Sequence, residues 1–253
     1  MSSSATKRSV VLAVATVAAT GASLAMATPA EAATNATWSK GILTISGDSA
    51  ANTIVVGRDA GGHIKVNGGS VKIRGGQATT SNTTRVQVFG SGGSDTVTLD
   101  EGNGPLPAAD LFGGADADTL TGGSKADQLW GQAGDDRLVW GAPGGNDLVE
   151  GGEGADTLEA RGDGTAEAFS LTANGTRVRL DRAAGVASFI DLGATERIIV
   201  RAGGGDDTVN ATGNLAALIQ TTVYGEAGKD SLLGTNGADV LDGGDDADFV
   251  DGQ

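Results

Sequence analysis

A nine-residue repeat constrains this chain more than any other feature of its sequence. In each copy an Asp follows Gly-rich residues and precedes, by two positions, an apolar residue. The clearest copies begin at Gly113, Gly122, Gly131, Gly151, Gly225, Gly234 and Gly243. Their central aspartates are Asp118, Asp127, Asp136, Asp156, Asp230, Asp239 and Asp248, and an interrupted copy has Asp147 at the same position. Less regular copies surround Asp95 and Asp207. The spacing is nine within each run, apart from an eleven-residue step between Asp136 and Asp147.

An apolar column separates this repeat from a disordered Gly/Asp linker. The residues two positions after the ten aspartates are Val97, Leu120, Leu129, Leu138, Val149, Leu158, Val209, Leu232, Leu241 and Val250. All are Leu or Val. A disordered segment has no reason to keep an apolar residue in phase with a period of nine. The column therefore predicts ordered repeats that bury one side chain per copy.

A longer period lies above the short one. A shift of 112 residues maps Asp95 onto Asp207 and Asp118 onto Asp230, and it also maps 85–88 onto 197–200. The chain is thus a duplicated unit, in which a β-like spacer precedes a repeat array. The second array reaches only the start of a new nonapeptide at Gln253, so we expect it to be open or truncated there.

These patterns divide the chain into five expected parts. Residues 1–32 resemble a secretory signal peptide, with Lys7 and Arg8 before a small-residue apolar run and an A-x-A site at 30–32. The others are a β-rich spacer at 33–89, a first array at 90–160, a second spacer at 161–201 and a second array at 202–253. The leader predicts a secreted, extracellular protein, and no later apolar run is long enough to span a membrane.

The spacers have the composition of short strands. Alternating or β-branched runs between Gly, Asn and Asp turns occur at 42–45, 53–56, 63–66, 71–74, 85–88, 169–172 and 178–180. Outside the leader, helical periodicity is suggested only at Pro105–Asp110 and Leu215–Ile219. We therefore expect an all-β chain.

Charge narrows the possible functions. The formal net charge is -15, which argues against nucleic acid as a partner, because phosphates require Lys and Arg. The acidity is confined to the arrays, since 90–160 carries -12 and 202–253 carries -9, whereas 34–89 carries +4 and 161–201 carries +1. The chain has no Cys and one His, His63, so a thiol nucleophile or a Cys- or His-rich metal site is excluded.

The repeat has the chemistry of a hard-cation site. Consecutive glycines permit turns with positive φ and allow carbonyl oxygens to crowd one point. An Asp that closes such a turn adds a short carboxylate, and several oxygen ligands per site are what Ca²⁺ requires. The apolar residue then begins a short strand that points inward. Stacked copies would form a solenoid with a narrow aliphatic core and cation sites along its edges.

At this point the residues resemble the RTX, or haemolysin-type, calcium-binding repeat, G-G-x-G-x-D followed by x-apolar-x. The resemblance covers Gly113–Glu159 and Gly225–Gly252. It implies a parallel β-roll, or β-solenoid, in which two nonapeptides make one turn and several Ca²⁺ ions lie between alternate copies. Asp118 would face Asp136, Asp136 would face Asp156, Asp127 would face Asp147, and Asp230 would face Asp248. The implied ligands are these aspartates with Asp239, and the main chain of Gly113, Gly122, Gly131, Gly134, Gly151, Gly154, Gly225, Gly228, Gly234, Gly237 and Gly243.

Some positions depart from the pattern. Lys125 replaces the fourth-position glycine of one copy, and Lys229 immediately precedes Asp230. Because both place a cation beside an expected site, we expect weaker binding there. The outlying turns at Asp95 and Asp207 are expected to bind poorly or not at all.

The sequence predicts a secreted calcium-binding protein without enzymatic activity, whose arrays fold when Ca²⁺ binds. A calcium-stiffened adhesin or matrix scaffold remains an alternative, with an unidentified cell-surface, polysaccharide or protein partner. A Ca²⁺-dependent polysaccharide lyase or epimerase is a weaker alternative, because the spacers are short for a catalytic β-helix. Its nearest basic cluster, Arg177, Arg179 and Arg182, is interpreted as a solvated strand face.

Overall fold

A computed structural model describes residues 33–185 and 187–252. The expected signal peptide at 1–32 lies outside the described residues. The described residues form one compact unit. No helix in the described part of the chain is long and apolar enough to cross a membrane.

Two β-sheets account for this unit. In sheet order, the larger one consists of β22 (Phe249–Asp251), β20 (Ser231–Leu233), β18 (Thr208–Thr212), β14 (Ala168–Asn174), β15 (Arg177–Ala183), β16 (Ser188–Gly193), β12 (Asp147–Glu153), β10 (Gln128–Ala133), β8 (Ala109–Ala115), β6 (Arg85–Ser91), β2 (Ile42–Ser46), β1 (Asn35–Ser39) and β5 (Ile73–Arg74). The smaller one consists of β21 (Val240–Asp245), β19 (Gln220–Ala227), β17 (Arg197–Gly204), β13 (Thr157–Arg161), β11 (Arg137–Gly141), β9 (Thr119–Thr121), β7 (Thr96–Leu99), β3 (Thr53–Arg58) and β4 (Ile64–Val66). Two 3₁₀ turns, η1 (Asn67–Gly69) and η2 (Leu215–Ala217), complete the described elements.

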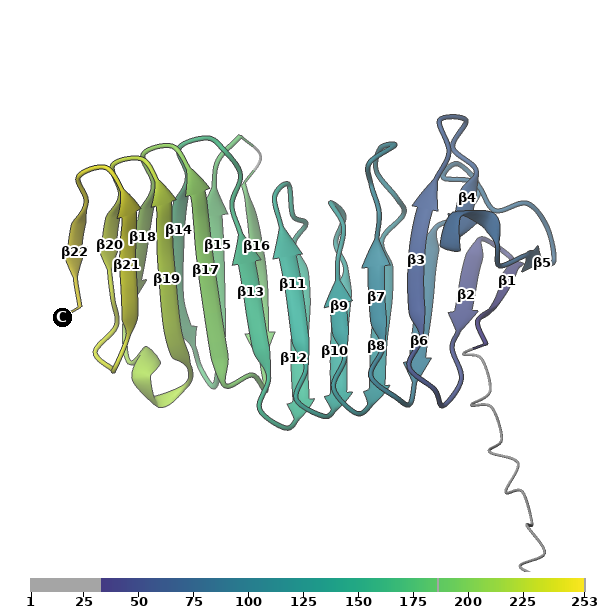
Figure 1. Cartoon of the computed structure of the whole chain (residues 1–253), viewed down its shortest axis with the longest axis horizontal. Helices are drawn as coiled ribbons and strands as arrows, with labels where there is room; N and C mark the ends of the chain where they lie inside the picture. The colour runs from purple at the N-terminus through teal and green to yellow at the C-terminus, as the bar shows by residue number, and fades with distance from the viewer. Residues whose placement is uncertain (1–32, 186, 253) are drawn as a thin grey trace, which may run out of the picture. The chain divides into compact units, whose positions relative to one another are not determined.

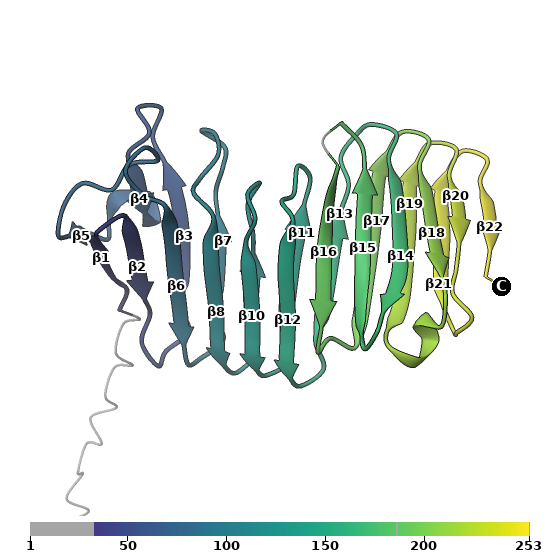
Figure 2. The same cartoon turned by 180° about the vertical axis from the view of Figure 1, so that it is seen from behind.

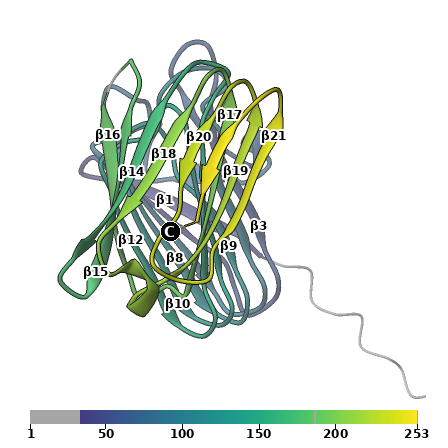
Figure 3. The ribbon, with the colours of Figure 1, turned by 90° about the vertical axis from the view of Figure 1, so that its left-hand side faces the viewer.

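The chain winds between the two sheets as a parallel β-roll. From β6 to β13 each strand lies in the sheet opposite to its predecessor, so alternate strands pair in parallel, as β8 does with β10 and β9 with β11. The coils stack along the length of the roll (Figures 1 and 2), and the end view shows the two sheets facing each other (Figure 3). The expectation of an all-β parallel roll is confirmed.

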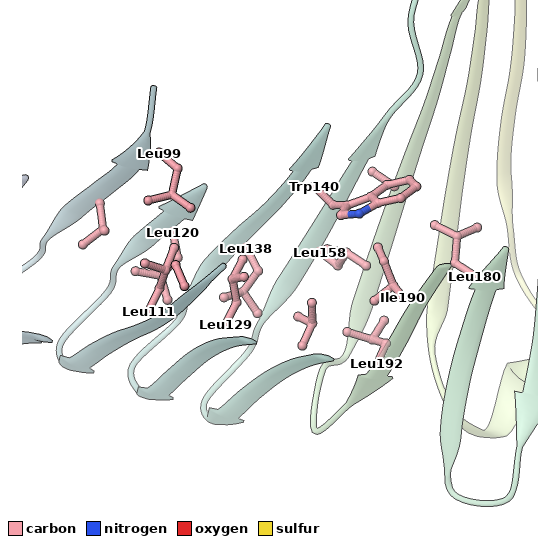
Figure 4. Packing of buried hydrophobic residues seen from close by; sticks show 14 of the residues in the cluster. Leu99, Leu111, Leu120, Leu129, Leu138, Trp140, Leu158, Leu180, Ile190 and Leu192 are labelled. Carbon is pink, nitrogen blue, oxygen red and sulfur yellow. The ribbon is translucent and has the colours of Figure 1, made fainter. Parts of the chain in front are cut away.

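A thin aliphatic core lies between the sheets. On the smaller sheet Leu120, Leu138 and Leu158 are in register on neighbouring strands, and Leu111 and Leu129 line the larger sheet opposite them (Figure 4). Eight of the ten residues in the apolar column are at most 1% exposed. Leu241 is partly buried and Val250, on the last coil, is 46% exposed. Each fully buried Leu or Val contributes about 1.5–3 kcal/mol, so the repeats form a core despite having few aromatic residues.

Local sequence patterns correctly predicted most spacer strands, but the two short helices that they suggested are not formed as expected. The runs at 42–45, 53–56, 85–88, 169–172 and 178–180 lie in strands, and those at 63–66 and 71–74 do so in part. Helix at Pro105–Asp110 is wrong, since this segment leads into β8, where Ala109 pairs with Val86. At Leu215–Ile219 the chain forms only the 3₁₀ turn η2.

The second spacer exchanges the sheets to which equivalent segments of the two arrays belong. Within it, β14, β15 and β16 all lie in the larger sheet, and β15 pairs antiparallel with both of its neighbours. The 112-residue shift carries β6 onto β17 and β8 onto β19. However, β6 and β8 belong to the larger sheet, whereas β17 and β19 belong to the smaller one. Equivalent segments of the duplication therefore lie on opposite sides of the roll.

Candidate metal centre

The repeat aspartates lie in the turns that join the two sheets or, for Asp147, at the first residue of the strand that follows. We call the turns that run from the larger to the smaller sheet the first edge, and those that run back the second edge. Asp95, Asp118, Asp136, Asp156 and Asp239 lie on the first edge. Asp127, Asp147, Asp207, Asp230 and Asp248 lie on the second.

Main-chain hydrogen bonds join the first-edge aspartates into a ladder. The N–H of each Asp donates to Oδ1 of the next, from Asp95 to Asp118 (2.7 Å), from Asp118 to Asp136 (2.7 Å) and from Asp136 to Asp156 (2.8 Å). Two other residue types extend the ladder. Asn52 N–H donates to Asp95 at 2.7 Å, and Asp156 N–H donates to Glu196 Oε2 at 2.8 Å.

The second edge carries two shorter ladders. In the first array, Asp127 N–H donates to Asp147 Oδ1 at 2.8 Å. In the second array, Asp207 N–H donates to Asp230 Oδ1 and Asp230 N–H donates to Asp248 Oδ1, both at 2.9 Å. The structure thus brings together all four pairs that the resemblance to the RTX repeat implies. It also places Asp95 and Asp207, which the sequence treats as outliers, in the same ladders.

The second carboxylate oxygen of these aspartates is buried without a hydrogen bond. This is so for Oδ2 of Asp95, Asp118, Asp136, Asp147, Asp156, Asp207 and Asp230. The seven side chains belong to residues at most 2% exposed. A buried carboxylate oxygen without a donor is strongly disfavoured, since it has lost its water and gained no partner. A bound cation would supply that partner.

Carbonyl oxygens from the next coil approach the same glycines as these Oδ2 atoms. A methyl group on Gly113 would collide with both Asp118 Oδ2 and the Gly131 carbonyl oxygen. The same holds at Gly131, with Asp136 and the Gly151 carbonyl, and at Gly90, Gly151 and Gly225 with their own aspartate and the carbonyl of the following coil. Only glycine fits at these positions, because a carboxylate and a carbonyl converge on its α-carbon. A carboxylate oxygen without a hydrogen bond and a carbonyl oxygen that converge on one point suit a hard cation.

Burial makes the ladder carboxylates weak acids in the absence of a cation. It raises the pKa of Asp118 and Asp207 from 3.8 to about 7, that of Asp136 to about 6 and that of Asp147 to about 8. Burial also raises the pKa of Asp95, Asp156 and Asp230. Backbone N–H donors oppose these shifts, and neighbouring carboxylates add to some of them, as Asp136 does for Asp118. The main cause is the cost of keeping a charge away from water.

Not every expected ligand has a free oxygen. Asp127 accepts Ala109 N–H at Oδ1 and Gly123 N–H at Oδ2, although burial raises its pKa to about 6. Asp239 accepts the main-chain N–H and the hydroxyl of Thr235. Asp239 thus closes its own turn with both oxygens, whereas Asp127 closes its turn through Oδ2 and bonds the start of β8 through Oδ1. At Gly122 an added methyl group would still lie 3.4 Å from Asp127 Oδ2, so this turn is more open than those at Gly113 and Gly131.

The remaining expected glycines shape the turns in different ways. Gly134, Gly154 and Gly228 have φ between 129° and 140° and lie against a main-chain carbonyl of the preceding coil. Gly234 and Gly243 lie against Asp239 and Asp248 of their own turns, whereas Gly237 lies against Ala216. Some turns reach positive φ without glycine, at Asp116, Gln132, Glu226 and Asp246, so the repeat keeps its backbone shape where its sequence departs from the pattern.

Among the residues that the structure describes, neither the lysines nor a cluster of acidic side chains forms a metal site, so main-chain oxygens are needed as ligands. Lys125 and Lys229 are exposed, and Lys229 N–H donates to Asp206 at 3.0 Å. No group of three or more His, Asp or Glu side chains is placed to hold a metal among residues 33–185 and 187–252. A cation in these ladders would therefore be held by carboxylates together with carbonyl oxygens.

At one position of the second edge, a buried arginine side chain pairs with the acidic residue. Glu167 N–H donates to Asp207 Oδ1 at 2.7 Å, and a methyl group on Gly162 would collide with Glu167 Oε2 and the Ala202 carbonyl. Glu167 is therefore the equivalent of a repeat aspartate. Its Oε1 accepts Arg182 Nε at 2.8 Å, and both side chains are almost fully buried. The interpretation of Arg182 as part of a solvated face is therefore wrong.

Sequence patterns missed this pair for a simple reason. Gly162–Glu167 has Glu where the repeat has Asp, and Arg182 comes from a hairpin fifteen residues later. The glycine at 162 and the acid at 167 keep the spacing of a repeat turn, and this was the only available signal. Arg177 and Arg179, the other members of that basic cluster, pair with carboxylates on the outer face of the larger sheet.

Comparison with known families agrees with this geometry. The model of the RTX calcium-binding nonapeptide repeat matches four segments, at residues 86–104, 112–142, 144–163 and 224–253. The matched segments contain Asp95 and all eight expected ligand aspartates, whereas Asp207 lies outside them. No curated protein gives a significant match to the chain.

Proposed function

We propose that this chain, which carries four copies of the RTX calcium-binding nonapeptide repeat in a β-roll, is a secreted protein. Its roll is stabilised by Ca²⁺ along both edges. The ligands are the ladder aspartates and the carbonyl oxygens of first-position glycines. One observation carries the proposal: seven buried aspartate oxygens have no hydrogen bond. No catalytic step is part of the proposal.

Calcium would supply folding energy in this arrangement. The ladder places ionised groups where burial opposes their charge, and whole domains retain only about 5–15 kcal/mol of stability. A ligand that binds only the folded form stabilises it by mass action. Extracellular calcium modules typically bind at about 10⁻⁴–10⁻³ M, so the roll would respond to calcium outside the cell.

Circular dichroism of the chain in chelator and then in millimolar CaCl₂ tests the folding part of the proposal. We expect β-sheet signal and a cooperative thermal transition to appear, or to strengthen, on addition of Ca²⁺. Mg²⁺ at equal concentration serves as the control, because it prefers rigid octahedral sites with several waters. Identical spectra and melting curves in all three solutions would reject coupling between calcium and folding.

A matched pair of variants tests the ligand assignment. Asp136→Asn keeps an acceptor for the Asp118 N–H but replaces the carboxylate with a neutral amide. Asp135→Asn removes the same charge from the neighbouring exposed residue, whose Oδ1 accepts Ala155 N–H. Calorimetric titration should show fewer bound Ca²⁺ ions in Asp136→Asn and an unchanged number in Asp135→Asn. Equal loss in both variants would mean that bulk charge, not the ladder, attracts calcium.

The leader-like segment supports export. If residues 1–32 are a signal peptide, the mature chain in the culture medium should begin at Ala33. Mass spectrometry of the protein from medium and from cells measures this directly. Intact chain confined to the cells would refute secretion while leaving calcium binding unaffected.

A further inference from the structure

Four arginines gather on the outer face of the smaller sheet, in the middle of an acidic molecule. They are Arg137 on β11, Arg161 on β13, and Arg197 and Arg201 on β17, three strands that lie side by side (Figure 1). Their neighbours in sequence, Leu138, Ala160, Ile198 and Val200, point into the core. The arginine side chains therefore point outward, and we call these four residues the arginine cluster.

One carboxylate serves three of these guanidinium groups. Glu159, whose side chain is 8% exposed, contacts Arg137, Arg161 at 2.6 Å and Arg201 at 3.5 Å. Glu226 adds a second carboxylate, 3.2 Å from Arg201. Arg197 donates to the neutral Gln220 at 3.3 Å. Four positive charges thus meet two negative ones, and the cluster retains a net charge of +2.

The guanidinium groups keep donors for a further ligand. Each has five N–H donors, and one carboxylate accepts about four hydrogen bonds. The side chains of Arg137, Arg161 and Arg201 are 40–47% exposed. Arg161 and Arg201 are also directly paired across neighbouring strands, and like charges in that position repel. A bound anion would relieve this repulsion and use the free donors.

The opposite face of the roll shows a different arrangement. There Arg177 lies between Glu150 and Asp191, and Arg179 pairs with Asp181 while stacking on Phe189 at 3.9 Å. Each of these arginines has at least one carboxylate of its own. Arg177 and Arg179 therefore lack the excess of positive charge that the arginine cluster has.

We propose that the arginine cluster binds an acidic polysaccharide that carries carboxylate or sulfate groups along its length. From β11 to β17 the cluster spans two strand spacings, about 10 Å, which is more than a single carboxylate covers. Planar guanidinium groups match carboxylate and sulfate oxygens in paired hydrogen bonds. Arg201 covers one face of the Tyr224 ring at 4.5 Å, so that face is not available for the bases of a nucleic acid to stack on.

Affinity measurements on the calcium-loaded full chain test this assignment. The probes are polygalacturonate and dextran sulfate, with neutral dextran and monomeric galacturonate as controls. We expect salt-sensitive binding to at least one acidic polymer and none to dextran, with the two acidic probes distinguishing carboxylate from sulfate. Arg201→Gln should weaken binding about fivefold, the scale of one exposed ion pair. Equal affinity for the monomer and the polymer would contradict an extended site.

Two further variants separate recognition from folding. Arg179→Gln removes the same charge from a side chain of similar exposure on the other sheet and should leave the affinity unchanged. Glu159→Gln frees the three guanidinium groups and should strengthen binding, although it removes ion pairs from the fold. Equal affinity in all variants would place the polymer on the calcium ladders instead, and self-association without polymer binding would assign the face to a second copy. Either result overturns the proposal.

Discussion

At the scale of single residues, seven of the ladder aspartates combine burial, an N–H donor on one oxygen and no donor on the other. Their raised pKa values give a defined pH dependence. A carboxyl whose pKa is higher in the folded state than in the unfolded chain binds protons more tightly when folded. Stability then falls as the pH rises from the unfolded value to the folded one.

For the calcium-free chain this window is wide. It begins near pH 3.8, the ordinary value, and extends to about 8, the pKa of Asp147. We expect the melting temperature in chelator to be higher at pH 5 than at pH 8, and calcium affinity to decrease from pH 8 to pH 6 as protons compete for the same oxygens. Melting curves and titrations at the two ends of the window measure both trends. A calcium-free chain that becomes more stable toward pH 8 would contradict the burial of these charges.

The first-position glycines define a second prediction at this scale. Gly113→Ala would force a methyl group against Asp118 Oδ2 and the Gly131 carbonyl, so the turn must open. We expect a lower melting temperature and the loss of at least one calcium site. Gly164→Ala is the matched control, because a methyl group there meets nothing within 4 Å. If both alanine variants melt and titrate alike, the carboxylate and carbonyl do not converge as described.

At the scale of elements, the hairpin β14–β15 provides the resident cation of the second-edge ladder. Arg182→Met would leave Glu167 buried without its partner, which typically costs about 3–5 kcal/mol. The double variant Glu167→Gln/Arg182→Met should recover much of the loss, because it removes the uncompensated charge. Thermal unfolding in chelator and in Ca²⁺ measures both. A single variant with the melting temperature of the unchanged chain would show that the pair contributes nothing.

The same hairpin contains a contact that could not be predicted from the sequence. The ladder pairs were predictable from the resemblance to the RTX repeat, because the two copies per turn that it implies return every second Asp to the same edge. The partner of Glu167 was not, since Arg182 reaches it only through the pairing of β14 with β15. Nor was the arginine cluster, whose members lie on three strands up to 64 residues apart and share a surface only because those strands stack in parallel.

At the scale of the molecule, the two arrays carry separate ladders. Asp136 and Asp230 lie on different edges and share no hydrogen-bonded partner among those described, whereas Asp118 and Asp136 are directly bonded. Free energies of distant substitutions add, and those of neighbours do not. In Ca²⁺ we expect Asp136→Asn and Asp230→Asn to be additive within about 0.5 kcal/mol, and Asp118→Asn and Asp136→Asn to deviate from additivity. Strong coupling between the first pair would indicate that the arrays act as one unit.

The exchange of sheets between the two halves also determines how the molecule meets its surroundings. Segments related by the duplication, such as β6 and β17, belong to opposite sheets. Any recognition surface that the two halves inherited in common would therefore point in opposite directions. A single chain with such surfaces cannot clasp one partner between them. It would hold two partners apart, back to back, as a bivalent cross-linker does.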